Sequence, residues 1–321
     1  MEGQITVIGA GKMGLGIAQF FAQNDKEIVL VDLNERVIEE APDKIKEELI
    51  HLVNIGILKE EKAKEILNRI NFSSNLNDAS SSKLIFEAIP EKLDLKRNLF
   101  NRLEKICDIS TIFATNTSGI SINEISTVLK RPERFIGAHF FMPAAIIPLI
   151  EVVKSDRTDH GVADYIITLF KTLGKEAVLV RKDIPGFIAN RIQHAMAREA
   201  ISLLEKGVAS AEDIDTVIKW SLGIRMIFTG PLEQRDFNGL DIHSDIAAYL
   251  YEDLENRTVA SPLLLQKVEK GEIGVKANKG FYEWDEDTKQ QHIQAKNDAL
   301  LKMIKYLEKE SMNNNESNYK E

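Results

Sequence analysis

The first sixteen residues constrain the fold more than any other part of this 321-residue chain. The β-branched run ITVIG leads directly into AGKMGLG, which places Gly9, Gly11 and Gly14 in a G-x-G-x-x-G pattern. An amphipathic segment, residues 14–23, follows, and a second apolar run, EIVLVD, ends on Asp32. A strand, this glycine pattern, a helix and an acid about 20 residues further on are typical of a dinucleotide-binding βαβ unit.

Each residue type in this pattern has a physical reason. Gly9 permits a tight turn, Gly11 lets the backbone approach a pyrophosphate, and Gly14 lets the helix pack closely on its strand. The amide groups at the helix N-terminus would then face the phosphate charge. Asp32 could accept hydrogen bonds from both hydroxyls of an adenine ribose and would repel a 2′-phosphate, so we expect NAD rather than NADP. The alternative is a glycine-rich turn in another kind of α/β protein.

The composition is that of a globular protein, with 44% hydrophobic and 28% charged residues. A net charge of −9 argues against nucleic acid as a partner, and no apolar run approaches the ~20 residues that a membrane helix needs. The sequence offers no Cys/His cluster for a metal. The single Cys107 and a strand so close to the first residue, which leaves no room for a signal peptide, predict a cytoplasmic protein.

Strand and helix patterns alternate through residues 1–182, which predicts a Rossmann-like domain with a doubly wound, mostly parallel sheet. After Asp183-Ile-Pro-Gly, long helical patterns dominate, so we expect residues 183–310 to form an all-helical substrate and dimerisation domain. Its apolar content exceeds what one small bundle needs, which favours a homodimer built through it. The polar segment 311–321 is expected to be a disordered tail.

The segment AHFFMPAAIIPLIEVVKS contains the strongest candidate for chemistry. His139 ends one predicted strand, a proline-containing turn reverses the chain, and Glu151 lies on the next strand. Transfer of hydride from an alcohol to NAD needs a base for the hydroxyl proton, and histidine titrates in a suitable range. Glu151 would fix the imidazole tautomer and stabilise the imidazolium. The alternative is a hydrogen-bonded core histidine beside a surface glutamate.

Six motifs, in order along nearly the whole chain, resemble the L-3-hydroxyacyl-CoA dehydrogenase family. They are GAGKMGLGIA, FEAIPEKLDLK, ATNTSGISI, AHFFMPAAIIPLIEVV, DIPGFIANRI and GVKANKGFYEW. The resemblance implies a Rossmann-like domain followed by a helical dimerisation domain. It implies that His139 is the catalytic base and Glu151 its partner, that Ser118 hydrogen-bonds the reacting oxygen, and that Asn190 lies at the substrate end of the cleft.

The same resemblance implies that Glu91 and Lys96, in the PEKLDLK segment, lie near the nicotinamide half of the cofactor. Several of these residues also have ordinary structural interpretations. Ser118 could be a turn or helix-cap residue, Asn190 a helix-start residue, and Lys96 a solvated charge on a helix.

Two departures from the family pattern bear on the substrate. The family reads HFFNP where this chain has Met142 in place of the asparagine, so an apolar side chain replaces a polar one beside the base. The segment GPLEQRDFNGLD carries Gln234, Arg235 and Asp236 where the family is more apolar. Arg235 could bind a substrate carboxylate, or it could form a surface ion pair with Asp236.

The function expected from the resemblance is NAD-dependent interconversion of a short- or medium-chain 3-hydroxyacyl-CoA, such as 3-hydroxybutyryl-CoA, and its 3-oxo form. This reaction belongs to fatty acid metabolism. A dehydrogenase of a free hydroxy acid, or of another substrate without CoA, is the first alternative, motivated by Met142 and Arg235. A non-catalytic NAD-binding protein is the second alternative.

Overall fold

The computed structural model describes residues 3–317 of the chain. The chain divides into two compact units, residues 1–190 and residues 191–321. The boundary that the sequence suggests, after Lys182, lies in the connection between the last strand of the first unit and the helix α7 (Ala189–Glu205). Each unit is described below by itself.

The first unit contains a single sheet of eight short strands. They are β1 (Ile5–Ile8), β2 (Ile28–Val31), β3 (Ile70–Ser73), β4 (Leu84–Glu87), β5 (Ile112–Thr115), β6 (Phe135–Phe140), β7 (Leu149–Val153) and β8 (Glu176–Val180). Their order in the sheet is β3-β2-β1-β4-β5-β6-β7-β8. All neighbours pair in parallel except β6 and β7, which are antiparallel. The prediction of a doubly wound, mostly parallel sheet is confirmed.

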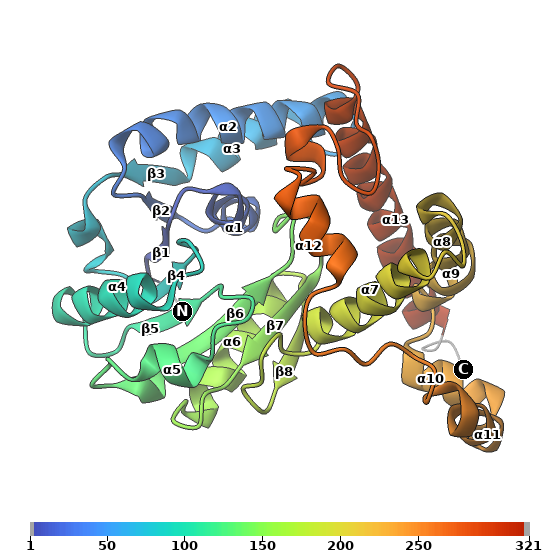
Figure 1. The fold of residues 1–321 in the computed structure, drawn as a ribbon. Helices are drawn as coiled ribbons and strands as arrows, with labels where there is room; N and C mark the ends of the chain where they lie inside the picture. The colour runs from blue at the N-terminus through green and yellow to red at the C-terminus, as the bar shows by residue number, and fades with distance from the viewer. Residues whose placement is uncertain (1–2, 318–321) are drawn as a thin grey trace. The chain divides into compact units, whose positions relative to one another are not determined.

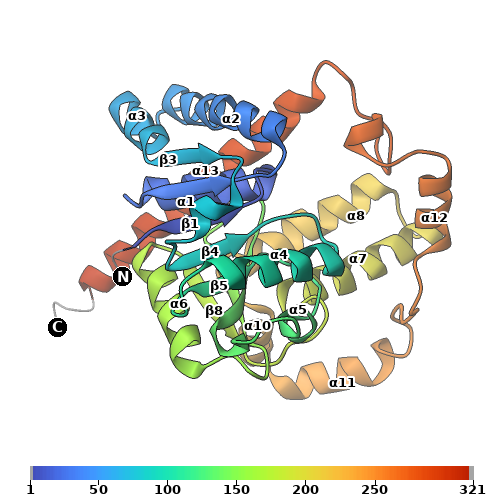
Figure 2. The same cartoon turned by 90° about the vertical axis from the view of Figure 1, so that its left-hand side faces the viewer.

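Helices cover both faces of this sheet (Figures 1 and 2). On one face the core includes residues of α1 (Lys12–Gln23), α2 (Glu35–Asn54), α3 (Glu60–Asn68) and α6 (His160–Thr172). On the other face it includes residues of α4 (Leu93–Ile106) and α5 (Ile122–Ser126). Both faces of the central strands are therefore buried, which explains why their sequences are continuous apolar runs rather than alternating ones.

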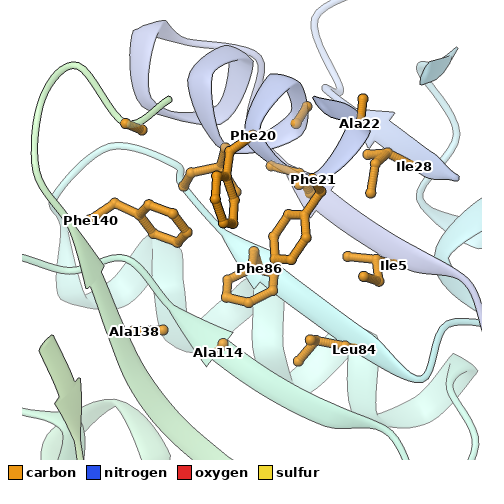
Figure 3. Packing of buried hydrophobic residues seen from close by; sticks show 14 of the residues in the cluster. Ile5, Phe20, Phe21, Ala22, Ile28, Leu84, Phe86, Ala114, Ala138 and Phe140 are labelled. Carbon is orange, nitrogen blue, oxygen red and sulfur yellow. The ribbon is translucent and has the colours of Figure 1, made fainter. Parts of the chain in front are cut away.

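A group of phenylalanines packs between α1 and the sheet (Figure 3). Phe21 lies 5.1 Å from Phe86, and Phe20 lies 5.8 Å from Phe140 in an edge-to-face arrangement, with distances measured between ring centroids. Phe170 of α6 contacts all four rings. Each buried phenylalanine stabilises the fold by about 1.5–3 kcal/mol, so this cluster fixes α1 firmly against the sheet.

The alternation of side chains along the strands sends the polar residues to the opposite face. Ala138 and Phe140 belong to the core beneath α1 and α6, so His139, which lies between them, points toward the face that α4 and α5 cover. The same reasoning places Glu151 and Glu87 on that face. The sheet thus gathers its buried carboxylates and its histidine on one side.

Local residues mark where helices of the first unit end and begin, and one strand was not predicted. A turn at Gly56 separates α2 from α3. Ser121 caps α5, because its hydroxyl accepts a hydrogen bond from the Glu124 amide at 3.2 Å. The edge strand β3 was not predicted from the sequence. Of its four residues only Ile70 is buried, so it lacks the apolar run that marks the other strands.

The second unit is helical, as predicted. Besides the rest of α7 it contains α8 (Ala211–Val217), α9 (Ile224–Met226), α10 (Pro231–Asn238), α11 (Leu240–Leu250), α12 (Pro262–Glu269) and α13 (Lys289–Ser317). A π-helical segment, Ile218–Gly223, joins α8 to α9. Among the described residues of this unit, only Ser202 and Ile214 are buried.

An apolar stripe runs along the segment from α8 to just beyond α9. Val217, Trp220, Ile224 and Phe228 recur at roughly helical spacing and are 63%, 72%, 46% and 69% exposed. Helical residues three or four positions apart lie on one face. We call these four residues the apolar stripe.

The C-terminal helix extends further than expected. The backbone of α13 is helical to Ser317, so the predicted disordered tail, residues 311–321, begins inside a helix, and its last four residues lie outside the described part. Extending a helix that has already formed costs little, even for polar residues. No helix within residues 3–317 is long and apolar enough to cross a membrane, and in that range no group of His, Cys, Asp or Glu could hold a metal ion.

Candidate active site

His139 of β6 and Glu151 of β7 are direct cross-strand partners in the antiparallel register. The His139 Nδ1 atom lies 2.9 Å from Glu151 Oε2, and the two residues are only 5% and 1% exposed. Because Nδ1 faces the carboxylate, Nε2 is the ring nitrogen left to take a proton from another group. The structure therefore brings the predicted pair together as a histidine–carboxylate dyad.

The other oxygen of Glu151 lies at the beginning of α7. Glu151 Oε1 accepts hydrogen bonds from the amides of Ile188, at 3.0 Å, and Ala189, at 2.9 Å. Burial opposes ionisation of this carboxyl. The hydrogen bonds from His139 and from the two amides outweigh burial and hold the pKa of Glu151 below its ordinary value. Glu151 is thus set up to stay negative beside the imidazole.

Ser118 lies in the turn between β5 and α5, and the carboxylate of Glu91 holds this turn. Glu91 Oε1 accepts from the Thr117 hydroxyl at 2.6 Å, the Ser118 amide at 2.9 Å and the Gly119 amide at 3.2 Å. Burial opposes ionisation of Glu91, but the Thr117 hydroxyl and the Lys96 ammonium hold its pKa below the ordinary value. The exposed Ser118 side chain is therefore carried on a turn whose backbone is fixed.

Asn190 lies beside Ser118. The Asn190 side-chain amide donates to the Ser118 carbonyl oxygen at 3.0 Å. In the same region, Asn116 Oδ1 accepts from the Phe140 amide at 2.8 Å, which ties the end of β6 to the residue after β5. The predicted residues Ser118 and Asn190 thus lie together, and Asn116 links their turn to the strand that carries His139.

Lys96 is enclosed rather than exposed. Its ammonium lies 2.7 Å from Glu87 Oε1 and 3.3 Å from Glu91 Oε2, and its side chain is 1% exposed. Burial raises the pKa of Glu87, and the Lys96 ammonium and the Thr115 hydroxyl offset this only in part. Lys96 therefore links the buried carboxylate of Glu87 to the carboxylate of Glu91, which holds the Ser118 turn.

The glycine pattern forms the turn between β1 and α1. Gly9 has a φ of +103°, which a residue with a side chain rarely adopts. A Cβ atom on Gly14 would lie 1.7 Å from the Gly9 carbonyl oxygen, so only glycine allows α1 to start this close to β1. Gly11 has no atom within 4 Å of such a position, which leaves its backbone open to a ligand.

A cavity of about 620 Å³ opens beside this turn. Asp32 lines it, and the carboxylate accepts from the Ala10 amide at 2.8 Å and the Asn34 amide at 2.9 Å. Each carboxylate oxygen has a further lone pair, so Asp32 could still accept from ribose hydroxyls. The other lining residues are Ile8, Gly9, Gly11, Lys12, Met13, Leu33, Val37, Ala88, Ile89, Pro90, Leu95, Asn98, Leu99 and Arg102.

The cavity suits the adenosine diphosphate half of a dinucleotide. It combines open backbone at a helix N-terminus, an acid directly after β2, and apolar side chains for a flat base, which come from Leu33 after β2, from α2 and from α4. Lys12, on the first turn of α1, adds a positive charge beside the phosphate position. Arg102 adds a second cation.

The two departures from the family motifs, at Met142 and at Arg235, lie in different units. Met142 follows the strand that carries His139, and its side chain is 60% exposed. Arg235, in α10 of the second unit, lies 3.5 Å from the His243 imidazole. No ion pair between Arg235 and Asp236 occurs in the described part of the chain.

Sequence reasoning did not single out several residues that shape this site. Glu87 and Thr115 anchor Lys96, and Asn116 links two strands. An acid at the end of an otherwise apolar strand was a signal for Glu87 that could have been read. Phe187 lies with its ring centroid 5.8 Å from that of His139, and no sequence pattern indicates that contact.

Comparison with known proteins agrees with this geometry. The family model described as 3-hydroxyacyl-CoA dehydrogenase, NAD binding domain, matches residues 4–184. The model of the C-terminal domain of the same family matches residues 186–284. A probable 3-hydroxybutyryl-CoA dehydrogenase of Bacillus subtilis is 37% identical over 89% of this chain and 98% of its own.

A second kind of relative acts on a substrate named without CoA. The 5-formyl-3-hydroxy-2-methylpyridine 4-carboxylate 5-dehydrogenase of Mesorhizobium japonicum is 33% identical over 87% of this chain and 89% of its own. A crystal structure of an enzyme of that activity, described as an NAD⁺-dependent dismutase, matches with a TM-score of 0.89 and 30% identity, over 96% of this chain and 99% of that one. The (S)-3-hydroxybutyryl-CoA dehydrogenase PaaH1 of Ralstonia eutropha gives 0.73, with 32% identity, over 88% and 99%.

Two family models that together span most of the chain, and relatives above 30% identity over nearly nine-tenths of it, agree with the dyad and the dinucleotide turn. The chain is a member of the 3-hydroxyacyl-CoA dehydrogenase family, an NAD-dependent oxidoreductase that acts on CH–OH groups.

Proposed function

We propose that the protein interconverts a hydroxyl and a carbonyl group with His139 as the catalytic base. The observation that carries this proposal is the buried His139–Glu151 pair, whose Nδ1–carboxylate distance is 2.9 Å. In the oxidative direction His139 Nε2 accepts the hydroxyl proton. NAD, when bound, would supply the acceptor for the hydride of the same carbon. Glu151 keeps the imidazole in one tautomer and stabilises the positive charge that the proton brings.

In this proposal Ser118 and Asn190 position the substrate. The Ser118 hydroxyl donates to the reacting oxygen, and Asn190 lies beside it at the substrate end of the site. Orienting the reacting carbon is a large part of the rate enhancement in such reactions. The hydrogen bonds from the 117–119 turn to Glu91 support this assignment, because they fix the backbone that carries Ser118.

The cofactor would contact two groups of residues. The turn that Gly9, Gly11 and Gly14 form would hold the pyrophosphate, with Gly11 as its open backbone position, and Asp32 would bind the adenine ribose. Glu91 and Lys96 are both predicted to lie near the nicotinamide half, but only Glu91 is proposed to act on it directly. Because Lys96 is enclosed by two carboxylates, we propose that it acts on the cofactor only through Glu91.

The substrate proposed first is a short- or medium-chain 3-hydroxyacyl-CoA, such as 3-hydroxybutyryl-CoA. The B. subtilis relative, named as a probable 3-hydroxybutyryl-CoA dehydrogenase, supports this substrate. The reaction would then belong to fatty acid metabolism. We further propose a cytoplasmic enzyme with a substrate and dimerisation domain in residues 183–310.

A specific observation favours a second substrate class, a free carboxylic acid that carries an alcohol or an aldehyde. The TM-score to the pyridine-carboxylate dehydrogenase is 0.89, against 0.73 for PaaH1. Met142 also stands where the family pattern HFFNP has a polar asparagine beside the base. Arg235 is a cation without a carboxylate partner in the described part of the chain, and such a cation is compatible with an acid substrate.

The test is NADH oxidation by the purified protein, with acetoacetyl-CoA and free acetoacetate assayed in parallel. Turnover of the CoA ester alone supports the first substrate. If only the free acid reacts, or an aldehyde-bearing aromatic acid does so in a wider screen, the second substrate class is supported. Tight NADH binding without turnover of any such compound would support a non-catalytic NAD-binding protein instead.

A further inference from the structure

A left-handed turn lies directly before the two amides that hold Glu151. Gly186 has a φ of +75° and Phe187 a φ of +49°. Glycine adopts this conformation without a steric cost, but a residue as bulky as phenylalanine rarely does. Backbone strain of this kind persists only where the surroundings over-determine it, and it is concentrated at functional sites.

The surroundings of Phe187 hold it in place. Its side chain is 1% exposed and belongs to the core beneath α4 and α5. The Phe187 amide donates to the Ile184 carbonyl oxygen at 3.0 Å, which closes the turn. Its ring meets the His139 ring edge-on, with an interplanar angle of 62° and centroids 5.8 Å apart. The same residue therefore contacts the imidazole and sets the direction of the chain that follows.

That direction brings two amides to one atom. The next residues, Ile188 and Ala189, both donate to Glu151 Oε1, at 3.0 and 2.9 Å. With a right-handed or extended Phe187 the chain would leave the turn in another direction, and the amides would not converge on that oxygen. These amides also help to hold the pKa of Glu151 below its ordinary value.

We infer that Phe187 is a positioning residue for the dyad. Its left-handed backbone directs the amides of Ile188 and Ala189 toward Glu151. Its ring packs edge-on against the His139 ring and so limits the movement of the imidazole. This inference rests on the proposed role of His139 as the base. It adds that the geometry of the dyad depends on a residue outside the dyad.

Three substitutions separate the two contributions of Phe187. Phe187→Leu keeps a bulky apolar side chain, and leucine can adopt the left-handed backbone conformation about as well as phenylalanine does. Phe187→Gly keeps the left-handed backbone and removes the ring. Phe187→Val disfavours the left-handed backbone strongly, because β-branched residues are genuine outliers there.

The readouts are kcat, KM and NADH affinity measured by fluorescence, all at a temperature where each variant is folded. We expect kcat to fall by less than about 5-fold in Phe187→Leu and by about 10- to 100-fold in Phe187→Gly. A further loss is expected in Phe187→Val, since misplacement by about 1 Å can cost 100-fold. NADH affinity should stay within about twofold of the parent, because the cofactor cavity is formed elsewhere in the unit. Phe100→Leu is the matched control, a fully buried phenylalanine of the same core cluster with no contact to the dyad.

A second measurement does not depend on turnover. The proton on His139 Nδ1 should give a downfield resonance in the ¹⁵N-labelled protein, assigned by its absence in His139→Gln. We expect Phe187→Leu to keep this resonance and Phe187→Val to shift or broaden it. If Phe187→Gly and Phe187→Val keep the kcat of Phe187→Leu, or lose only thermal stability as Phe100→Leu does, Phe187 is not a positioning residue. If the parent protein turns over no substrate, the proposed function fails, and the resonance alone decides the role of Phe187.

Discussion

The two units of this chain differ in how far they bury their large apolar side chains. The first unit buries its large side chains on both faces of a continuous sheet, including a phenylalanine cluster in which Phe21 and Phe86 are fully enclosed. The second unit has only Ser202 and Ile214 buried among its described residues. There Trp220 and Phe228 are 72% and 69% exposed.

This difference suggests that the two units have different roles. The first unit is a complete fold that can keep a histidine, a lysine and several carboxylates inside it at defined distances. The second unit leaves apolar surface exposed, and large exposed apolar patches mark interaction sites. If the predicted homodimer forms through this unit, a second copy of the chain could cover the stripe.

The first prediction tests whether the buried charges of Lys96 and Glu87 depend on each other for the stability of the first unit. Lys96→Met leaves Glu87 buried without its counter-ion, so the free energy of unfolding should fall by about 3–5 kcal/mol in urea titrations. Adding Glu87→Gln removes the orphaned charge and keeps an acceptor for Thr115, which should restore most of the loss. Arg36→Met, which breaks an exposed ion pair with Glu40, should change stability little. Equal losses in the buried and exposed variants would contradict the comparison.

The second prediction concerns Lys175, another enclosed cation of the first unit. Its ammonium donates to the carbonyl oxygens of Ala144 and Ile147, and burial lowers the pKa of Lys175 to about 8. Between this value and the ordinary 10.5, the unfolded chain binds one more proton than the folded one. Stability should therefore rise with pH across that window, by about 3 kcal/mol relative to Lys175→Met. A parent and a variant with parallel pH dependence from 7.5 to 10.5 would show that Lys175 keeps its ordinary pKa.

The third prediction tests the exposed side of the comparison. If the apolar stripe pairs two copies, Trp220→Glu should weaken dimerisation by about 2 kcal/mol or more, which is about 30-fold in the dissociation constant. Sedimentation equilibrium measures this directly. Ile109→Glu, which changes a side chain of the first unit that is 71% exposed, is the matched control and should leave assembly unchanged. A parent protein that is monomeric at micromolar concentration would remove the proposal.

The fourth and smallest prediction sharpens the assignment of the cofactor cavity. Asp32→Ala removes the proposed ribose acceptor and should weaken NADH binding by about tenfold, or about 1.4 kcal/mol, while NADPH binding changes less. Binding is measured by the fluorescence of the reduced nicotinamide. Asp25→Ala, which alters an exposed acid paired with Lys62, serves as the control. An unchanged ratio of the two affinities would contradict the contact.

Much of the first unit could be predicted because its signals are local. The apolar runs of β1, β4 and β5 and the glycine turn each specify their own structure, and the sheet class follows from their alternation. His139 and Glu151 could be paired from the sequence because a short reversal joins their strands and brings the two neighbours together. The weakly apolar edge strand β3 carries no such signal, so it was missed.

The remaining parts depend on contacts between segments that are distant in the chain. Lys96 looks like a solvated helix charge in the sequence, and only the fold reveals that Glu87 and Glu91 enclose it. Phe187 reads as an ordinary core residue, although its positive φ decides where two amides point. The exposed stripe of the second unit has helical spacing, but its lack of cover becomes visible only in three dimensions.

The most direct test of the central claim is a paired measurement on the parent protein and His139→Gln. NADH binding is titrated by fluorescence, and turnover is followed with the best substrate from the parallel assay of CoA esters and free acids. We predict that His139→Gln binds NADH as the parent does and loses about 10³-fold or more in kcat, as expected when a general base is removed. A variant that keeps most of its kcat would show that the His139–Glu151 pair is not the catalytic dyad.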